Sequence, residues 1–175
     1  MQFPCSYLTI VGGTFDHLHP GHKILLTVTA YLASRKLICG ITGSASSISL
    51  IPDDALLKNK KYAEFLESIS LRTQNVRNFL TLIARHLELE LIPIQDVYGP
   101  TAYDPDISAL VISEETRAGA KSIADLRKEK GLQELDIFVI DVIGDKTGKV
   151  AMETMAEEKM SSTKIRRRLA YNLPQ

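Results

Sequence analysis

An apolar strand that runs straight into a glycine-rich turn and then a helix is the feature that most constrains this chain's fold. Residues 7–11 read Tyr-Leu-Thr-Ile-Val, Gly12 and Gly13 follow, and an amphipathic run begins after His22. Such a turn sets a helix N-terminus, with its unpaired N–H groups and positive dipole, beside the end of a strand. His19 and His22 stand at its mouth, and imidazoles add donors that can carry positive charge. The stretch predicts a phosphate site.

Two other interpretations of the same residues stay open at this point. The two histidines are also compatible with an ordinary turn that faces solvent. Their His-x-x-His spacing suits a metal site as well, but such ligands usually need further His, Cys or carboxylate partners. The position at the junction of the first strand and helix favours the phosphate site.

Strand-like and helix-like segments alternate along the whole chain. The expected strands cover residues 7–12, 36–42, 90–94, 109–113 and 136–143, and the expected helices cover 21–34, 60–87, 115–130 and a last one that begins near Ser161 or Ser162. Near-continuous apolar strands between helices indicate a parallel sheet that is covered on both faces. We therefore predict an α/β fold, a Rossmann-like doubly wound parallel sheet of about five strands with helices on both faces.

In such a sheet the ligand lies beyond the carboxyl ends of the strands, where the strand order switches. This rule gathers the loops at 12–22, 96–104 and 113–117, together with the end of the strand at Thr42, around one crevice. Residues 43–57 are rich in turn formers and lack periodicity, so we expect a mobile loop or an insertion there.

Length and charge exclude several classes of partner. The 175 residues suit a single domain that spans 1–175. Lys and Arg balance Asp and Glu at 21 each, so no overall field recruits nucleic acid or a membrane surface. No apolar run approaches the ~20 residues of a membrane span, and the N-terminus lacks a secretory pattern, so we expect a cytoplasmic protein. Cys39 lies in an apolar run and is expected to be a buried free thiol.

A second candidate anion site lies near the C-terminus. Residues 159–168 read Lys-Met-Ser-Ser-Thr-Lys-Ile-Arg-Arg-Arg, so hydroxyls stand at a helix start with cations on the following turn. Taken alone, this run is equally compatible with a capped helix that has a basic, solvated face. Together with the first loop it gives two phosphate-binding elements at matching ends of a parallel sheet.

The first loop resembles the HxGH signature of the nucleotidylyltransferase superfamily, and the C-terminal run resembles its second phosphate-binding element. With Asp-Val-Tyr-Gly-Pro-Thr at 96–101 and Val-Ile-Ser-Glu-Glu-Thr-Arg at 111–117, the chain resembles the phosphopantetheine adenylyltransferase family, in its archaeal and eukaryotic type. The resemblance covers residues 7–170. It implies that ATP and 4′-phosphopantetheine react to give dephospho-coenzyme A and pyrophosphate.

The resemblance also implies roles for individual residues. His22 would donate to the α-phosphate with His19 and Thr14 beside it, and Lys58 would bridge the acceptor and the α-phosphate. The residues implied in nucleotide binding are Gly12, Gly13, Thr14, His19, His22, Ser161, Ser162, Thr163 and Arg166. Those implied in substrate binding are Lys58, Arg117 and Tyr98. Mg²⁺ is expected to travel on the ATP phosphates, with no dedicated protein cage.

Several points stay open in the sequence. Lys60 and Lys61 rival Lys58, Lys159 rivals Arg166 at pyrophosphate, and Asp16 suits either a turn cap or a ligand contact. Bacterial members carry an additional Arg beside the position of Arg117. Lys121, Arg127 or the cluster at 166–168 are the candidates for that missing charge.

The alternatives for function are another small-molecule nucleotidylyltransferase, of the cytidylyltransferase or nicotinamide-mononucleotide adenylyltransferase type, and a non-catalytic nucleotide-binding subunit. A zinc protein is disfavoured, because Cys5, Cys39, His17 and His86 show no ligand spacing. A homo-oligomer, or an association with other enzymes of coenzyme A synthesis, is compatible with the resemblance.

Overall fold

The computed structural model describes residues 7–43, 56–57, 60–140 and 161–172. Most of the expected loop at 43–57, the end of the expected strand at 136–143, and the side chains of Lys58 and Lys159 lie outside these ranges.

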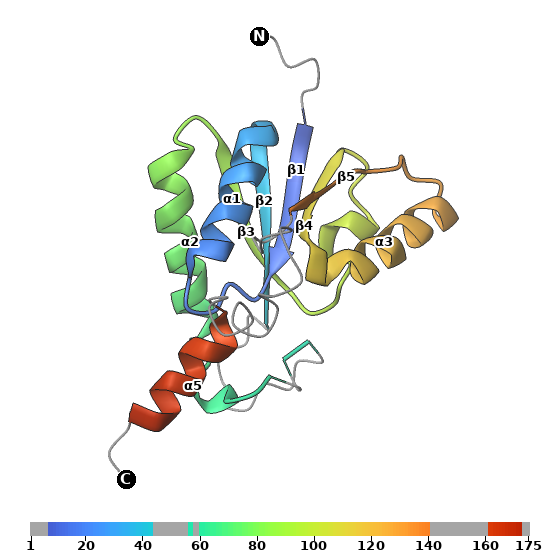
Figure 1. Cartoon of the computed structure of the whole chain (residues 1–175). Coiled ribbons are helices and arrows are strands. Elements are labelled where there is room, and N and C mark those ends of the chain that lie inside the picture. Colours follow the sequence, from blue (N-terminus) through green and yellow to red (C-terminus); the bar gives the residue numbers. More distant parts are fainter. Residues whose placement is uncertain (1–6, 44–55, 58–59, 141–160, 173–175) are drawn as a thin grey trace, which may run out of the picture.

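Five parallel strands form one sheet in the described part of the chain (Figure 1). They are β1 (Tyr7–Gly13), β2 (Ala33–Thr42), β3 (Glu88–Ile94), β4 (Ala109–Ser113) and β5 (Asp136–Ile140). Their order across the sheet is β3-β2-β1-β4-β5. The chain builds outward from β1 to β3, then returns to the other side of β1 for β4 and β5. The strand order therefore reverses between β1 and β4, as the predicted doubly wound fold requires.

Helices cover both faces of this sheet. The helices are α1 (Pro20–Leu32), α2 (Ile69–Ile83), α3 (Arg117–Glu129) and α5 (Ser162–Asn172), with short 3₁₀ turns η1 (Ala63–Phe65), η2 (Gly99–Ala102) and η3 (Glu114–Thr116). One face of the sheet packs Val11, Cys39 and Val111 against Leu26 of α1 and Leu80 of α2. The predicted α/β fold with helices on both faces is confirmed.

The opposite face is covered by α3, which carries a second apolar cluster. Ile10, Leu110 and Ile112 of the central strands pack there against Ala120 and Ile123 of α3. Because both faces are covered, residues 37–42 of β2 are buried without interruption, as is typical of a strand inside a parallel sheet. Cys39 is a buried free thiol, as expected, and burial raises its pKa.

The helix expected at 60–87 is shorter than predicted. Only residues 69–83 are α-helical, because Ser68 takes the N-cap position and its side chain accepts a hydrogen bond from the Leu71 amide (3.2 Å). The residues before Ser68 form η1 and connect to the first loop. The helix expected at 21–34 ends at Leu32, since Ala33 already pairs with Tyr7 in the sheet.

Candidate active site

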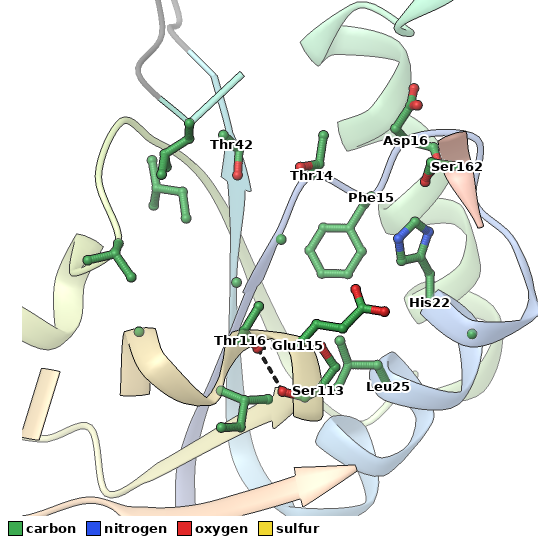
Figure 2. A pocket seen from close by; sticks show the side chains of 18 of the residues that line it. Thr14, Phe15, Asp16, His22, Leu25, Thr42, Ser113, Glu115, Thr116 and Ser162 are labelled. Carbon is green, nitrogen blue, oxygen red and sulfur yellow. Dashed lines mark hydrogen bonds between the residues drawn. The ribbon is translucent and has the colours of Figure 1, made fainter. Parts of the chain in front are cut away.

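A cleft of about 430 Å³ opens where the strand order reverses, at the carboxyl ends of β1 and β4 (Figure 2). Three stretches far apart in the sequence line it: the loop between β1 and α1, the turn after β4, and the start of α5. The expected crevice is thus present. Its lining includes all nine residues that the sequence implicated in nucleotide binding, namely Gly12, Gly13, Thr14, His19, His22, Ser161, Ser162, Thr163 and Arg166.

The loop after β1 is fixed by a buried arginine and a buried phenylalanine. Arg72 is buried on α2, and its Nη1 donates to the carbonyl oxygens of Thr14 (2.7 Å) and Thr42 (2.8 Å). Phe15 is fully buried in the left-handed region (φ 50°). A Cβ at Gly13 would lie 3.2 Å from the Phe15 ring, so glycine is favoured at this position. The backbone that faces the cleft is therefore rigidly placed.

The two histidines stack on each other at the floor of the cleft. The ring centroids of His19 and His22 are 3.8 Å apart with 23° between the planes, and His22 also meets the edge of Phe15 at 5.4 Å. A Cβ at Gly21 would come within 3.1 Å of the His19 ring, so a larger residue would crowd the stack. The Nδ1 atoms of both rings are buried without a hydrogen-bond partner among the described residues. Such nitrogens suit a tautomer that carries its proton on Nε2.

Burial keeps both imidazoles neutral in the free protein. Desolvation lowers the pKa of His22 to about 3, and the positive charge of Lys60, like that of His19 if it took up a proton, acts in the same direction. Desolvation also lowers the pKa of His19, although the carboxylates of Asp16 and Glu115 oppose it. Each ring can therefore offer an N–H donor without carrying a charge, and an anion bound beside it would raise its pKa.

Lys60 is the cleft-lining lysine among the described residues. Burial and the nearby charge of Arg166 lower its pKa, whereas Asp16 and Glu115 raise it. Lys61 is exposed and turns its backbone carbonyl toward Arg166. Lys58, the residue implied by the resemblance, lies outside the described residues, so the geometry draws attention to its rival Lys60.

The start of α5 closes the cleft from the side of the first loop. The Ser162 hydroxyl donates to the Asp16 carbonyl (2.8 Å), and the Ser161 hydroxyl accepts from the Lys164 amide (3.4 Å). Because the Ser162 hydroxyl donates to the protein whereas the Ser161 hydroxyl accepts, the Ser161 hydroxyl and the first backbone amides of α5 are the candidate donors to an anion. Figure 2 shows Ser162 next to Asp16, on the same side of the cleft as His22.

Arg166 lies deeper than the sequence suggested. Its side chain is 2% exposed, and its guanidinium donates to the Asp16 carboxylate, to the Lys61 carbonyl (3.0 Å) and to the Thr163 hydroxyl (3.3 Å). It borders the cleft, but these protein contacts occupy one N–H on each of its three nitrogens. Asp16 is itself fully buried, which favours the structural role that the sequence left open.

The two described residues that the resemblance implied in binding the acceptor, Arg117 and Tyr98, do not line the cleft. The Arg117 side chain is exposed and pairs with Glu114 (2.8 Å), and it is absent from the described lining of the cleft. Tyr98 packs against the apolar cluster under α3, and its neighbours Asp96 and Val97 line the cleft instead. Apolar side chains complete this half of the cleft: Ile94, Leu110, Ile112, Ile123 and Ile140.

Arg127 is not available to supply the missing positive charge. It is fully buried, and its guanidinium donates to the carbonyl oxygens of Gln133, Thr101, Asp104 and Ile107 at 2.8–3.3 Å. It therefore fastens the loop between β3 and β4 to α3. Since Arg127 is four residues after buried Ile123, its place on the apolar stripe of α3 was a sequence signal for burial.

A possible ligand cluster that the sequence spacing did not indicate lies behind the first loop. It consists of Asp16, His17 and Glu67, each of which has one ligand atom within 4.8 Å of the others. His17 Nε2 lies 2.9 Å from the Phe65 carbonyl, Glu67 accepts from the His17 amide (2.7 Å), and Asp16 accepts from the Glu67 amide (3.0 Å). These hydrogen bonds account for the cluster as a brace between the loop and residues 65–67.

Comparisons with known proteins identify the family of this chain. The model of the cytidylyltransferase-like family matches residues 10–168. A phosphopantetheine adenylyltransferase of Saccharomyces cerevisiae is 44% identical over 93% of this chain, and one of Pyrobaculum aerophilum is 35% identical over 90%. The chain spans about half the length of the yeast relative (48%) and 88% of the archaeal one.

A solved structure of a protein with unknown function from Archaeoglobus fulgidus has the same fold. It is 29% identical, has a TM-score of 0.57, and the match covers 81% of this chain and 98% of that one. The chain belongs to the cytidylyltransferase-like family. The resemblance to phosphopantetheine adenylyltransferases is confirmed by relatives of that name in both a yeast and archaea.

Proposed function

We propose that this protein transfers the adenylyl group of ATP to 4′-phosphopantetheine, forming dephospho-coenzyme A and releasing pyrophosphate. The observation that carries the proposal is one cleft in which the stacked pair His19 and His22 faces the amide-rich start of α5. The names of the yeast and archaeal relatives support the choice of substrates.

The reaction needs little covalent chemistry from the protein. A phosphate oxygen of the acceptor attacks the α-phosphorus of ATP, the bond from that phosphorus to the bridging oxygen breaks, and pyrophosphate leaves with the electron pair. The acceptor phosphate is already an anion at neutral pH, so we assign no general base. Catalysis then depends on holding the two anions in line and on stabilising charge at the α-phosphate.

The residues of the cleft divide this work. His22 donates from Nε2 to an α-phosphate oxygen, with His19 and Thr14 beside it. The helix starts of α1 and α5 bind the phosphates through backbone amides. Lys60 shares with Lys58 the role of bridging the acceptor and the α-phosphate. Arg117 and Tyr98, which lie outside the described lining of the cleft, would act only from its edge on the acceptor side.

The acidic groups of the cleft fit a metal ion that arrives with the nucleotide. Arg166 engages the Asp16 carboxylate, and two backbone amides donate to Oδ1 of Asp96 (2.8 Å each), so Asp16 is committed to Arg166 and one oxygen of Asp96 to its own turn. Mg²⁺ bound to the phosphates would neutralise charge on their oxygens. We propose a cytoplasmic site of action, as the apolar pattern of the sequence led us to expect. In the described part of the chain, no helix has the length and apolar character needed to cross a membrane.

The test pairs the purified protein with ATP, CTP or GTP and with 4′-phosphopantetheine or nicotinamide mononucleotide, and follows pyrophosphate release. Release with ATP and 4′-phosphopantetheine, at least about tenfold above the other pairs, is expected. Release with CTP, or with nicotinamide mononucleotide, would assign a different member of the superfamily. ATP binding without pyrophosphate release would indicate a non-catalytic subunit.

A further inference from the structure

The buried carboxylate of Asp16 lies where three separate segments of the cleft meet. Its Oδ1 accepts from the Glu67 amide (3.0 Å), its Oδ2 accepts from Arg166, and its backbone carbonyl accepts from the Ser162 hydroxyl (2.8 Å). The Asp16 side chain is 0% exposed. One residue of the first loop is thus bonded both to residues 60–68 and to α5.

Arg166 completes the junction from the other side. From α5 it reaches the Asp16 carboxylate in the first loop and the carbonyl of Lys61, the residue after cleft-lining Lys60. Its third contact, with the Thr163 hydroxyl (3.3 Å), stays within α5. The ion pair therefore joins the histidine loop, the segment that carries Lys60 and the second anion-binding helix start.

The energetics of a buried ion pair indicate that this pair fixes geometry more than it adds stability. A buried ion pair gains little over a well-packed apolar pair, whereas removal of one partner leaves a buried charge without compensation. Asp16 and Arg166 are 150 residues apart, so local structure does not bring them together. Their paired burial fixes the distance between two helix starts that must grip the same phosphates.

We propose that Asp16 and Arg166 are positioning residues that set the spacing between the histidine loop, Lys60 and the start of α5, and so control the affinity for the triphosphate. Neither acts by direct contact with the nucleotide in this view. The proposal rests on the proposed function for the assignment of these segments to ATP.

The first test compares the same substitution at two buried arginines. Arg166→Lys keeps the charge and loses the planar fork, and Arg127→Lys does the same at a site where the guanidinium donates to backbone carbonyls of residues outside the described lining of the cleft. Both should lower the melting temperature. Arg166→Lys should raise the KM for ATP at least about tenfold with the KM for 4′-phosphopantetheine within about twofold, whereas Arg127→Lys should leave the KM for ATP unchanged. Equal effects of the two variants on the KM for ATP would overturn the proposal.

The second test separates positioning from direct contact. A carboxylate does not attract phosphate, so Asp16→Asn should weaken ATP binding only if Asp16 acts through Arg166 and α5. The double variant Asp16→Asn/Arg166→Lys should bind ATP no more than about twofold worse than the weaker-binding single variant. Normal ATP affinity in a folded Asp16→Asn variant, or additive losses in the double variant, would show that Arg166 acts by direct contact instead.

A third measurement does not depend on the proposed reaction. Amide hydrogen exchange in the absence of nucleotide should be faster across residues 60–68 and 162–172 in Arg166→Lys, and unchanged there in Arg127→Lys. Unchanged exchange in Arg166→Lys would overturn the coupling. If the wild-type protein binds ATP but releases no pyrophosphate with 4′-phosphopantetheine, the proposed function fails while the exchange and binding comparisons still decide the positioning role.

Discussion

His22 and His19 owe their properties to packing rather than to sequence spacing. The two rings are stacked and partly buried, His22 also contacts Phe15, and desolvation lowers the pKa of both histidines. A neutral imidazole in this place is a preorganised N–H donor that costs no repulsion against its stacked neighbour. The two histidines should therefore affect both the turnover number and the pH dependence of stability.

Replacing His22 by Ala should lower the turnover number by about 10²–10³, because one donor aimed at the transition state is lost. The fold should persist, since the ring lies at the floor of an open cleft. Steady-state kinetics and circular dichroism measure the two effects. His86→Ala, an exposed histidine outside the cleft, is the matched control and should keep normal turnover. Near-normal turnover in folded His22→Ala would remove His22 from the mechanism.

The stability of the free protein should fall as the pH drops below about 6.5. The pKa of His22 is about 3 in the folded protein and 6.5 in an unfolded chain, so the unfolded chain takes up the proton first on acidification. The contribution of His22 is complete above pH 6.5, and about 1–2 kcal/mol of it should be lost by pH 5. Urea unfolding at pH 7 and pH 5 measures this. His22→Asn should show a flatter profile, and an identical profile would contradict the burial of the ring.

At the scale of elements, three buried arginines connect helices to loops. Arg72, Arg127 and Arg166 lie on α2, α3 and α5, and each donates to backbone carbonyls of a distant loop. Arg72 is four residues before Val76 and eight before Leu80, so it falls on the buried stripe of α2. An arginine on an apolar stripe is thus a sequence signal for a loop anchor, although its acceptor is not readable from the pattern.

Gly119 on α3 allows that helix to approach the loop after β3. A Cβ at this position would lie 2.7 Å from Cγ2 of Val97, and both residues line the cleft. Gly119→Ala should therefore destabilise the protein by about 1 kcal/mol, since overpacking costs about 1–3 kcal/mol and helix propensity returns up to about 1 kcal/mol. It should also raise the KM for 4′-phosphopantetheine more than that for ATP.

Denaturant unfolding and kinetics on Gly119→Ala measure both effects. A second substitution, Val97→Ala, removes the methyl group that would clash and should recover most of the lost stability. Increased stability in Gly119→Ala alone would mean that α3 and the loop after β3 are not in close contact.

At the scale of the whole molecule, the cleft joins segments from both ends of the chain. A ligand that binds only when they are assembled stabilises the folded state by mass action. ATP with Mg²⁺ at a hundred times its dissociation constant should add about 2.7 kcal/mol and raise the melting temperature by about 5–10 °C. Differential scanning fluorimetry measures this shift. AMP at the same concentration should give a smaller shift, because it lacks the phosphates assigned to α5, and an equal shift would contradict that assignment.

The order of strands and helices was readable from the sequence because it depends on short-range periodicity. The apolar runs of β1, β2 and β4 and the glycine-rich turn were correctly predicted. The start of α2 was predicted too early. Ser68 caps the helix, and before it the Glu67 amide bonds to Asp16 and the Lys61 carbonyl to Arg166. That outcome depends on partners about 50 and 100 residues away, which a local pattern does not contain.

The sequence by itself determined the βα units and the two helix starts that we propose as phosphate sites, because strand periodicity, glycines and capping hydroxyls act within a few residues. It also carried the family resemblance that the comparisons confirmed. Only the tertiary structure decided that the two helix starts face one cleft, that the histidines are stacked and neutral, and that Arg166 is buried against Asp16. These features depend on packing between segments up to 150 residues apart and on the loss of water around them.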